Sequence, residues 1–463
     1  PENPATDMKL KITHTEPENT RLSLIFAGWS TGTPVYADIT KEGWDTAVAY
    51  DYTSIAFPLE EIKRYSTVYL YCWSLGVWAA SQVIPGSDIT MAFAAAGTEN
   101  PVSDTLGIPE AVFRGTAENL DERNLLKFRK RMLGPKSPTD VNAIAAGSMP
   151  TEDLKAELLA IIERQNRPSR PSICWTRAYI TDDDRIFPSH NQQKAWDSAV
   201  SEKRCAETFR LKSPHYVEMK AIVDSTIPDL KKVGKRFEDS TPTYDSNASA
   251  QASIAERLTE TLASKRLPEN GKTLELGQGT GLFTRKYAPV LSPAEAWFVD
   301  IYPTRHFGIA PKETYAVADA ETWLEQNNEQ FDTILSASTI QWFRNLRLFF
   351  RNAARSLRPG GRLVCSTYLP GTLGILDSFR PSPMLYRDAE EVEQFAKEHF
   401  RHVETFRQTI SLEFGSAKEA LRHLNDTGVG GAFGRFGSLR ELVKVLESGT
   451  DIITLNFNAL YIY

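Results

Sequence analysis

Cysteine is scarce in this 463-residue sequence, which has only Cys72, Cys174, Cys205 and Cys365. They are widely spaced and form no C-x-x-C pair, which argues against a structural zinc site and against a disulfide framework. Long apolar runs are also missing: none approaches the roughly 20 residues of a membrane-spanning helix, and no signal-peptide pattern stands at the start. Positive charge is not in excess, because the formal net charge is −6. We therefore expect a cytoplasmic protein with reduced thiols, no metal, no membrane association and no nucleic-acid partner.

The composition is that of an ordinary globular protein, with 41% hydrophobic and 24% charged residues. A chain of this length predicts two or three domains. Residues 1–7 precede the first methionine and are expected to be vector-derived. Apolar strand-like runs alternate with helical stretches in both halves of the chain, whereas residues 216–240 are polar and lysine-rich. We therefore predict one α/β domain at 8–217, a linker at 218–232 and a second α/β domain at 233–463.

A serine follows one of the predicted strands of the N-terminal half. The strand 67–71 runs into Cys72-Trp73-Ser74-Leu75-Gly76, and a helix is expected at 77–82. In a nucleophile elbow, a serine on such a turn is exposed at the carboxyl edge of the sheet, and the next backbone N–H stabilises an oxyanion. Cysteine replaces the usual first glycine, and it is small enough for a crowded turn. We predict Ser74 as the nucleophile, with Leu75 and Trp29 as backbone oxyanion donors.

An acid and a base follow the serine in the chain order of α/β-hydrolases. Asp184 comes after the predicted strand 173–180, and His215 lies in a Ser-Pro-His loop after the strand-like run 206–211. The local sequence does not separate Asp184 from Asp182 or Asp183 as the acid. His190 is a rival base, although we expect it to be exposed at the start of a helix. The alternative to a triad is a structural serine in an apolar turn.

Residues 8–217 resemble the BioG family of pimeloyl-ACP methyl ester carboxylesterases. The resembling segments are Phe26-Ala27-Gly28-Trp29, Tyr50-Asp51-Tyr52, Trp73 to Ala80, Gly97-Thr98, Gly107-Ile108-Pro109, Phe128, Arg131-Met132, Asp184 to Pro188 with Asn191-Gln192, and Pro214-His215. This resemblance implies an α/β-hydrolase fold, hydrolysis of pimeloyl-ACP methyl ester, and a triad of Ser74, Asp184 and His215.

A glycine-rich turn opens the C-terminal domain. The strand 272–276 leads into Gly277-Gln278-Gly279-Thr280-Gly281, whose spacing differs from the G-x-G-x-x-G pattern of dinucleotide-binding domains. Glycines allow the backbone to approach a ligand closely. Further polar residues follow in the order expected for a class I (Rossmann-like) methyltransferase that binds S-adenosylmethionine. The predicted cofactor-binding residues in this series are Glu275, Gly277, Gly279, Gly281, Asp300, Asp319, Ala320 and Ser336.

Residues 233–463 resemble the BioC family of malonyl-ACP O-methyltransferases. The resembling segments are Tyr244-Asp245, Ala248, Gln251, Phe331-Asp332 with Ser336, Ile340-Gln341-Trp342, Leu357 to Gly361, Ser366-Thr367, Pro370 to Leu373 with Ser378-Phe379, and Leu424 to Gly430. The resemblance implies methylation of the free carboxyl group of malonyl-ACP. It also implies that Tyr244 is a cofactor-binding residue. Tyr244, Gln341 and Trp342 are expected to line the substrate site, and Arg380 is a candidate for holding the substrate carboxylate. Structural roles for Trp342 and Tyr244 are the alternative.

Taken together, the two resemblances predict a bifunctional enzyme of biotin-precursor synthesis. Both substrates would be carried by acyl carrier protein, which is acidic. The segment 123–131 is strongly basic and is a candidate docking surface, the alternative being a solvated helix face. Its cations are Arg123, Lys127, Arg129, Lys130 and Arg131. Two other functions stay open: a methyltransferase with a non-catalytic hydrolase-like docking domain, or a small-molecule carboxyl methyltransferase with a general esterase.

Overall fold

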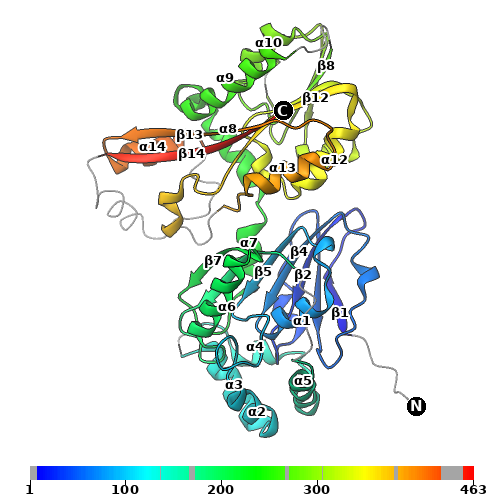
Figure 1. The fold of residues 1–463 in the computed structure, drawn as a ribbon, viewed down its shortest axis with the longest axis vertical. Helices are drawn as coiled ribbons and strands as arrows, with labels where there is room; N and C mark the ends of the chain where they lie inside the picture. The colour runs from blue at the N-terminus through cyan, green and yellow to red at the C-terminus, as the bar shows by residue number, and fades with distance from the viewer. Residues whose placement is uncertain are drawn as a thin grey trace. The chain divides into compact units, whose positions relative to one another are not determined.

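The computed structural model divides the chain into two compact units, residues 1–223 and 224–463 (Figure 1). It describes residues 8–135, 137–165, 173–265, 271–304, 306–379, 384–428 and 452–463. The predicted residue Arg380 and the pair 429–430 of the BioC resemblance lie outside the described residues, as do residues 1–7. Each unit is an α/β structure with its own β-sheet.

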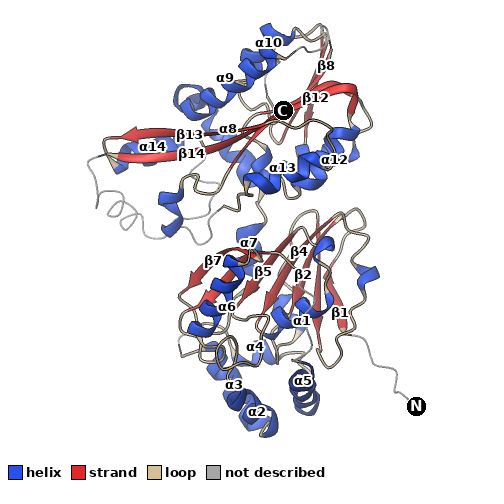
Figure 2. Cartoon of the chain, in the orientation of Figure 1, coloured by secondary structure: helices blue, strands red, loops and turns tan. Residues whose placement is uncertain are grey.

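A seven-stranded sheet forms the centre of the N-terminal unit (Figure 2). Its strands are β1 (Lys9–His14), β2 (Arg21–Phe26), β3 (Trp44–Tyr50), β4 (Thr67–Trp73), β5 (Met91–Ala95), β6 (Trp175–Thr181) and β7 (Cys205–Leu211). Their order is β1-β3-β2-β4-β5-β6-β7, and only β1 runs antiparallel to its neighbour. β2, β4 and β5 are buried along their whole length, which explains their uninterrupted apolar sequences. β1 and β3 were not predicted.

The helices of the N-terminal unit fall into two groups. α1 (Leu75–Val83) and α6 (Ser189–Ser201) connect strands of the sheet. Between β5 and β6 the chain instead forms α2 (Glu110–Glu118), α3 (Glu122–Leu133), α4 (Val141–Ala145) and α5 (Thr151–Arg164). α2, α3 and α5 lie together beyond one end of the sheet (Figure 1). Residues of these three helices share a pocket with Ser74, so this is the end at which the parallel strands finish.

The C-terminal unit contains a second seven-stranded sheet with Rossmann-like strand order. Its strands are β8 (Lys272–Leu276), β9 (Glu295–Asp300), β10 (Lys312–Val317), β11 (Phe331–Ser336), β12 (Leu357–Tyr368), β13 (Thr405–Phe414) and β14 (Ile453–Ile462). The order is β10-β9-β8-β11-β12-β14-β13, and β14 is antiparallel to both neighbours. The order reverses beside β8, so the turn after β8 lies at the point where such sheets bind ligands.

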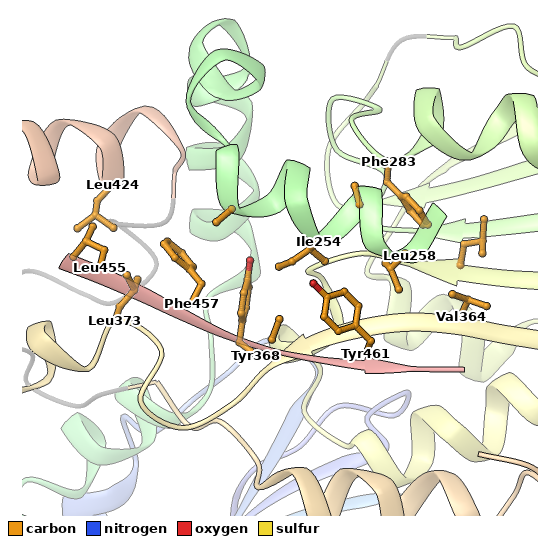
Figure 3. Packing of buried hydrophobic residues seen from close by; sticks show 14 of the residues in the cluster. Ile254, Leu258, Phe283, Val364, Tyr368, Leu373, Leu424, Leu455, Phe457 and Tyr461 are labelled. Carbon is orange, nitrogen blue, oxygen red and sulfur yellow. The ribbon is translucent and has the colours of Figure 1, made fainter. Parts of the chain in front are cut away.

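Helices cover this second sheet on both faces. They are α9 (Ser249–Ser264), α10 (Thr284–Leu291), α11 (Ala320–Gln326), α12 (Leu346–Arg355), α13 (Ala389–Lys397) and α14 (Ala417–Asp426). Two apolar clusters fill the layers. In one of them Ile254 and Leu258 of α9 pack with Tyr461 of β14 and Val364 of β12 (Figure 3). The other contains Phe349 and Phe350 of α12.

The segment predicted as a linker, 218–232, is largely helical. It contains α7 (Met219–Thr226) and the start of α8 (Leu230–Asn247), and the boundary between the two units falls after Val223, inside α7. The lysines that suggested a solvated linker are on the outer face of α8, whereas Val233 and Gly234 are buried. The apolar stripe of α8 is therefore narrow, which is why the sequence alone did not reveal the helix.

Two findings concern the expectations drawn from cysteine and from apolar runs. Within the described residues, no helix combines the length and the apolar character needed to cross a membrane. All four cysteines belong to that part of the chain and are free thiols, with Cys72, Cys205 and Cys365 buried.

Candidate functional site

Ser74 occupies a strained turn between β4 and α1. Its φ of +57° lies in the left-handed region that favours glycine. The turn is held by close packing, since a Cβ on Gly97 would lie 2.3 Å from the Ser74 carbonyl oxygen, and a Cβ on Gly76 would lie 2.4 Å from the Phe26 carbonyl oxygen. The Ser74 N–H also donates to the Ala95 carbonyl oxygen at 2.9 Å. Strain of this kind is retained at functional sites.

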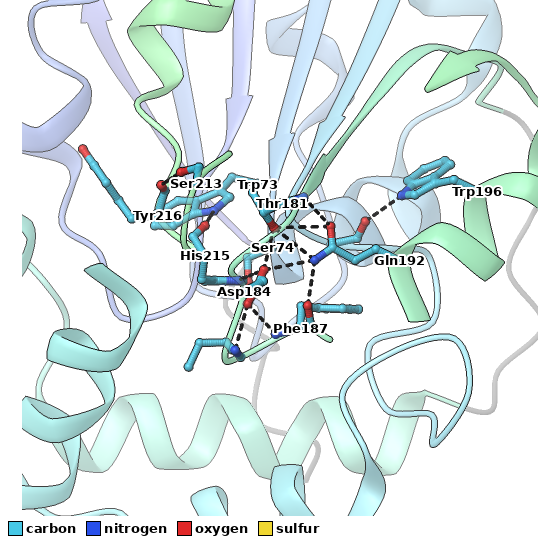
Figure 4. A network of polar contacts seen from close by, with 12 residues as sticks. Trp73, Ser74, Thr181, Asp184, Phe187, Gln192, Trp196, Ser213, His215 and Tyr216 are labelled. Carbon is cyan, nitrogen blue, oxygen red and sulfur yellow. Dashed lines mark hydrogen bonds and ion pairs between the residues drawn. The ribbon is translucent and has the colours of Figure 1, made fainter. Parts of the chain in front are cut away.

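His215 links the serine to an acid (Figure 4). Its Nε2 lies 2.9 Å from Ser74 Oγ, and its Nδ1 lies 2.8 Å from Asp184 Oδ2. The Trp73 indole N–H donates to the His215 carbonyl oxygen at 3.0 Å, and the two rings are 5.7 Å apart. His215 is only 1% exposed. The structure thus brings the three predicted triad residues into one hydrogen-bonded chain.

The Asp184 carboxylate has a full set of donors. The Ile186 and Phe187 backbone N–H groups both donate to Oδ1 at 2.8 Å. The Thr181 hydroxyl and the Gln192 amide donate to Oδ2 at 2.8 and 3.0 Å. Burial acts to raise the pKa of Asp184, but the neighbouring His215 and the two backbone donors outweigh it and lower the pKa. Asp184 is therefore ionised near neutral pH and favours the tautomer of His215 with the proton on Nδ1.

The other candidate acids, Asp182 and Asp183, and the rival base His190 do not belong to this hydrogen-bonded chain. Asp182 forms an ion pair with Arg210, and Asp183 is exposed. His190 is exposed in the first turn of α6. Of the three consecutive aspartates, only Asp184 contacts His215 in the described structure.

A mostly apolar cavity, the Ser74 pocket, opens beside the serine. Its walls are Trp29, Ser74, Leu75, Ile108, Val112, Phe113, Thr116, Phe128, Arg131, Leu158 and Ile186. The two predicted oxyanion residues, Trp29 and Leu75, therefore share one pocket with Ser74. The Trp29 indole N–H donates to the Leu154 carbonyl oxygen of α5 at 3.2 Å. The pocket reaches the surface, since Val112 is 47% exposed.

The basic segment 123–131 forms most of α3, and its five cations differ in environment. Arg123, Lys127, Lys130 and Arg131 are exposed, and Arg131 also lines the Ser74 pocket. Arg129 is different, because its guanidinium donates to the Ser30 carbonyl oxygen at 2.9 Å and to the Ser148 hydroxyl at 2.8 Å. The guanidinium of Arg129 is thus hydrogen-bonded within the protein, unlike the four exposed cations.

The glycine-rich turn of the C-terminal unit has the backbone conformation that its sequence predicts. Gly277, Gly279 and Gly281 have φ of +72°, +55° and +83°. A Cβ on Gly277 would lie 2.2 Å from Thr339 Oγ1, and one on Gly281 would lie 2.3 Å from the Phe307 ring. Side chains are thus excluded at two of the three positions by contacts within the protein.

A larger cavity, the glycine-turn pocket, lies against this turn. Its walls include Val233, Phe237, Tyr244, Gln251, Glu275, Gly277, Gln278, Gly279, Thr280, Asp300, Tyr302, Asp319, Ala320, Ser338, Thr339 and Trp342. The predicted residues Tyr244, Glu275, Gly277, Gly279, Asp300, Asp319 and Ala320 are among them. Seven of the nine predicted cofactor-binding residues are thus brought to one cavity.

Ser336, which the sequence predicts as a cofactor-binding residue, is not among the described walls of the glycine-turn pocket. Ser336 is fully buried, and its hydroxyl donates to the Leu276 carbonyl oxygen at 2.9 Å. Ala337, Ser338 and Thr339 just beyond it line the pocket instead. Gly281 is also absent from the described walls of this pocket, since it packs against Phe307.

Three carboxyl groups of the glycine-turn pocket have different partners. Asp300 accepts the Gly279 N–H at 2.8 Å, and burial raises the pKa of Asp300 to about 6. Burial likewise raises the pKa of Glu275 to about 7, and this carboxyl accepts the Thr284 and Tyr287 hydroxyls at 2.6 and 2.8 Å. Asp319 pairs with Arg344. Glu275 therefore holds α10 against β8, while Asp300 holds the glycine turn.

A side pocket adjoins the glycine-turn pocket. Its walls are Phe237, Tyr244, Gln251, Ser338, Gln341, Trp342, Tyr368, Thr372, Leu373, Met384, Tyr386 and Phe457, the first four and Trp342 being shared with the larger cavity. Gln341 and Trp342, two of the predicted substrate-site residues, thus both line this side pocket. Gln341 donates its amide N–H to the Ser338 carbonyl oxygen at 2.6 Å. Met384 and Tyr386 were not predicted, because neither belongs to a recognisable motif.

Two known families match different parts of the chain. The profile described as "Pimeloyl-ACP methyl esterase BioG" matches residues 9–222, and one described as "Methyltransferase domain" matches residues 246–413. The C-terminal unit is therefore a Rossmann-like methyltransferase domain. A solved BioG structure from Haemophilus influenzae is 31% identical, with a TM-score of 0.40, and the match covers 46% of this chain and 96% of that chain.

Two curated relatives carry methyltransferase or biotin names. A malonyl-[acyl-carrier protein] O-methyltransferase of Bacteroides fragilis (strain 638R) is 30% identical over 457 residues, which cover 95% of this chain and 91% of the relative. The biotin biosynthesis bifunctional protein BioCD of Bordetella avium (strain 197N) is 35% identical over 145 residues, 30% of this chain and 31% of the relative. The first match spans both units, so this relative shares the combination of the two units on one chain.

Proposed function

Because the chain belongs to the malonyl-[acyl-carrier protein] O-methyltransferase family, we propose that it is a bifunctional enzyme of biotin-precursor synthesis. The C-terminal unit methylates the free carboxyl group of malonyl-ACP, and the N-terminal unit hydrolyses pimeloyl-ACP methyl ester. The observation that carries the proposal is the pairing, on one chain, of a Ser74–His215–Asp184 hydrogen-bonded chain with a methyltransferase domain.

The glycine-turn pocket has the polar groups that S-adenosylmethionine needs. The buried side-chain oxygens of Gln251 and Gln278 accept no hydrogen bond from the described residues, and both residues line the pocket. S-adenosylmethionine carries an ammonium group, an adenine amine and ribose hydroxyls, which would supply donors to such acceptors. Asp300, at the end of β9, would accept the ribose hydroxyls. When bound, the cofactor supplies an electrophilic methyl group.

Methyl transfer requires positioning more than acid–base catalysis, because the acceptor carboxylate is already ionised near neutral pH. Tyr244 and Trp342 line both the glycine-turn pocket and the side pocket, so an acceptor held in the side pocket lies beside a cofactor in the larger one. Gln341 lines the side pocket only. We assign these three residues to substrate and cofactor positioning.

For the N-terminal unit we propose an α/β-hydrolase fold and a serine esterase mechanism. The Ser74 hydroxyl attacks the ester carbonyl carbon while His215 Nε2 takes its proton, and His215 then gives that proton to the departing methanol. Asp184 stabilises the imidazolium. Water repeats the sequence on the acyl-serine and releases the free carboxylate. The backbone N–H groups of Trp29 and Leu75 would hold the oxyanion.

The apolar walls of the Ser74 pocket offer a way to spare the short malonyl ester. Five methylene groups separate the two carbonyl carbons of a pimeloyl chain, and one separates those of a malonyl chain. When the terminal ester reaches Ser74, the longer chain places methylenes against Ile108, Phe113 and Leu158, whereas the shorter one would bring the polar thioester there. Burial of one methylene contributes about 0.8 kcal/mol, so the four additional methylenes favour binding of the longer ester by roughly 200-fold.

The exposed cations of α3 are proposed to bind the acidic carrier protein. Reversing two of them, Lys127→Glu with Lys130→Glu, should raise KM for a carrier-bound methyl ester by about tenfold at low salt, because each exposed pair contributes up to about 1 kcal/mol. The rate with a small soluble methyl ester should not change. Steady-state kinetics with both substrates measures this. The matched control is Lys194→Glu, an exposed lysine of α6. An equal rise in KM for both substrates would contradict carrier docking.

Two assays on one preparation test the proposed function. Labelled S-adenosylmethionine should methylate malonyl-ACP in preference to free malonate, and pimeloyl-ACP methyl ester should be hydrolysed faster than the malonyl ester. Equal methylation of free malonate would indicate a small-molecule carboxyl methyltransferase. Equal hydrolysis of all chain lengths would indicate a general esterase. Absence of hydrolysis would make the N-terminal unit a hydrolase-like docking domain.

A further inference from the structure

Glu157 is a buried acid that the esterase mechanism does not use. It lies on α5 and is 2% exposed. Its Oε1 accepts the backbone N–H of Tyr52 at 2.7 Å, while its Oε2 is buried and has no hydrogen-bond partner in the described residues. Burial raises the pKa of Glu157 to about 8, so the group is neutral at pH 7. A neutral acid in this place acts as a hydrogen-bond acceptor, which an amide can imitate.

Tyr52 continues this contact to the turn after β2. Its hydroxyl donates to the Ala27 carbonyl oxygen at 2.6 Å, and its side chain is 1% exposed. Ala27 precedes Gly28 and Trp29, and Trp29 is the proposed second oxyanion donor. Glu157 therefore reaches this turn through one intervening residue and two short hydrogen bonds.

A second contact joins α5 to the same turn. One helical turn before Glu157, the Leu154 carbonyl oxygen accepts the Trp29 indole N–H at 3.2 Å. The residue after Glu157, Leu158, lines the Ser74 pocket together with Trp29. A shift of α5 would thus move Trp29 directly through Leu154 and indirectly through Tyr52.

We propose that Glu157 is a positioning residue that, through Tyr52, holds the turn 27–29 where the Trp29 N–H can meet the oxyanion. The proposal rests on the esterase activity proposed above. Without Glu157 the buried Tyr52 N–H loses its acceptor, and a buried N–H requires one. The Tyr52 backbone and the Ala27–Trp29 turn would then shift together. Because oxyanion donors act on the transition state, the loss should appear in kcat and not in KM.

The test compares Glu157→Leu with Glu157→Gln. With a pimeloyl-ACP methyl ester, Glu157→Leu should lower kcat by roughly 10- to 100-fold and leave KM within about twofold, since small misplacements of a catalytic group cost up to about 100-fold. Glu157→Gln keeps an acceptor oxygen and should stay within about threefold of wild type. Glu163→Leu, an exposed acid of the same helix, is the matched control and should match wild type.

A second readout separates positioning from loss of fold. An alkylboronic acid forms a tetrahedral adduct with the serine that imitates the oxyanion, so Glu157→Leu should weaken its inhibition by the same factor as kcat. Tyr52→Phe breaks the link to Ala27 without removing the acid, and should lower kcat in the same way. The double variant should be no worse than the poorer single variant, because both act on one link.

Three results would overturn the inference. They are an unchanged kcat in Glu157→Leu, a matching loss in Glu157→Gln, and additive losses in the double variant. If Glu157→Leu does not fold, the Tyr52→Phe kinetics and boronate inhibition decide alone. A failure of the proposed function is recognised separately, because wild-type protein would then hydrolyse no carrier-bound ester at all.

Discussion

Replacing Ser74 by alanine should reduce hydrolysis of pimeloyl-ACP methyl ester by roughly 10⁴- to 10⁶-fold, the range seen when a serine-enzyme nucleophile is removed. The reason is that no other hydroxyl in the described structure accepts a hydrogen bond from, or donates one to, His215 Nε2. Methyl transfer to malonyl-ACP by the same protein should stay within about twofold. Release of methanol and transfer of a labelled methyl group measure the two activities.

The control for this substitution is Ser87→Ala, which removes an exposed hydroxyl of the same unit. The intact methyltransferase activity shows, in addition, that the C-terminal unit has folded. Persistent hydrolysis in Ser74→Ala would mean that the Ser74–His215–Asp184 arrangement is not the catalytic centre of the N-terminal unit. That result would favour a hydrolase-like docking domain.

Replacing Asp300 by alanine should raise the Kd for S-adenosylmethionine by about 150-fold. Two hydrogen bonds from ribose hydroxyls to a charged acceptor contribute about 1.5 kcal/mol each. The substitution also removes the acceptor of the Gly279 N–H, which loosens the glycine turn. Isothermal titration calorimetry measures the affinity, and unchanged ester hydrolysis shows that the N-terminal unit is unaffected.

The pH dependence of binding gives a sharper test of Asp300. Burial raises the pKa of Asp300 to about 6, so the carboxylate is ionised above that pH and protonated below it. Protonation removes acceptor capacity, and S-adenosylmethionine affinity should therefore fall as the pH drops through about 6. Asp300→Asn should bind weakly at all pH values and lack this fall. A Kd within about threefold of wild type in Asp300→Ala would contradict the assignment.

The sequence predicts sites best where a local pattern fixes the geometry. Ser74 and Gly277 follow predicted strands, and strand ends of a parallel sheet meet at one edge, so their surroundings could be anticipated. The choice among Asp182, Asp183 and Asp184 could not be made locally. It depends on which side chain turns toward a histidine 31 residues later, and the structure brings Asp184 and His215 to 2.8 Å.

The sequence reveals least where a shift of one or two residues changes the surroundings of a side chain. Ser336, the last residue of β11, donates its hydroxyl to the Leu276 carbonyl oxygen, whereas Ser338, beyond the strand end and with a φ of +53°, lines the pocket. In α3, Arg129 looks like its basic neighbours in the sequence, but it faces Ser30 and Ser148. Such contacts join residues that are distant in sequence, so local composition does not predict them.

The continuity of the chain through α7 has a consequence for the cell. The boundary between the units lies inside this helix, so both units are made in every round of translation. Their amounts are locked at one to one, and gene dosage or differential turnover cannot adjust one against the other. If a methyl group is added early and removed late, the length of the acyl chain alone must determine which unit acts on it.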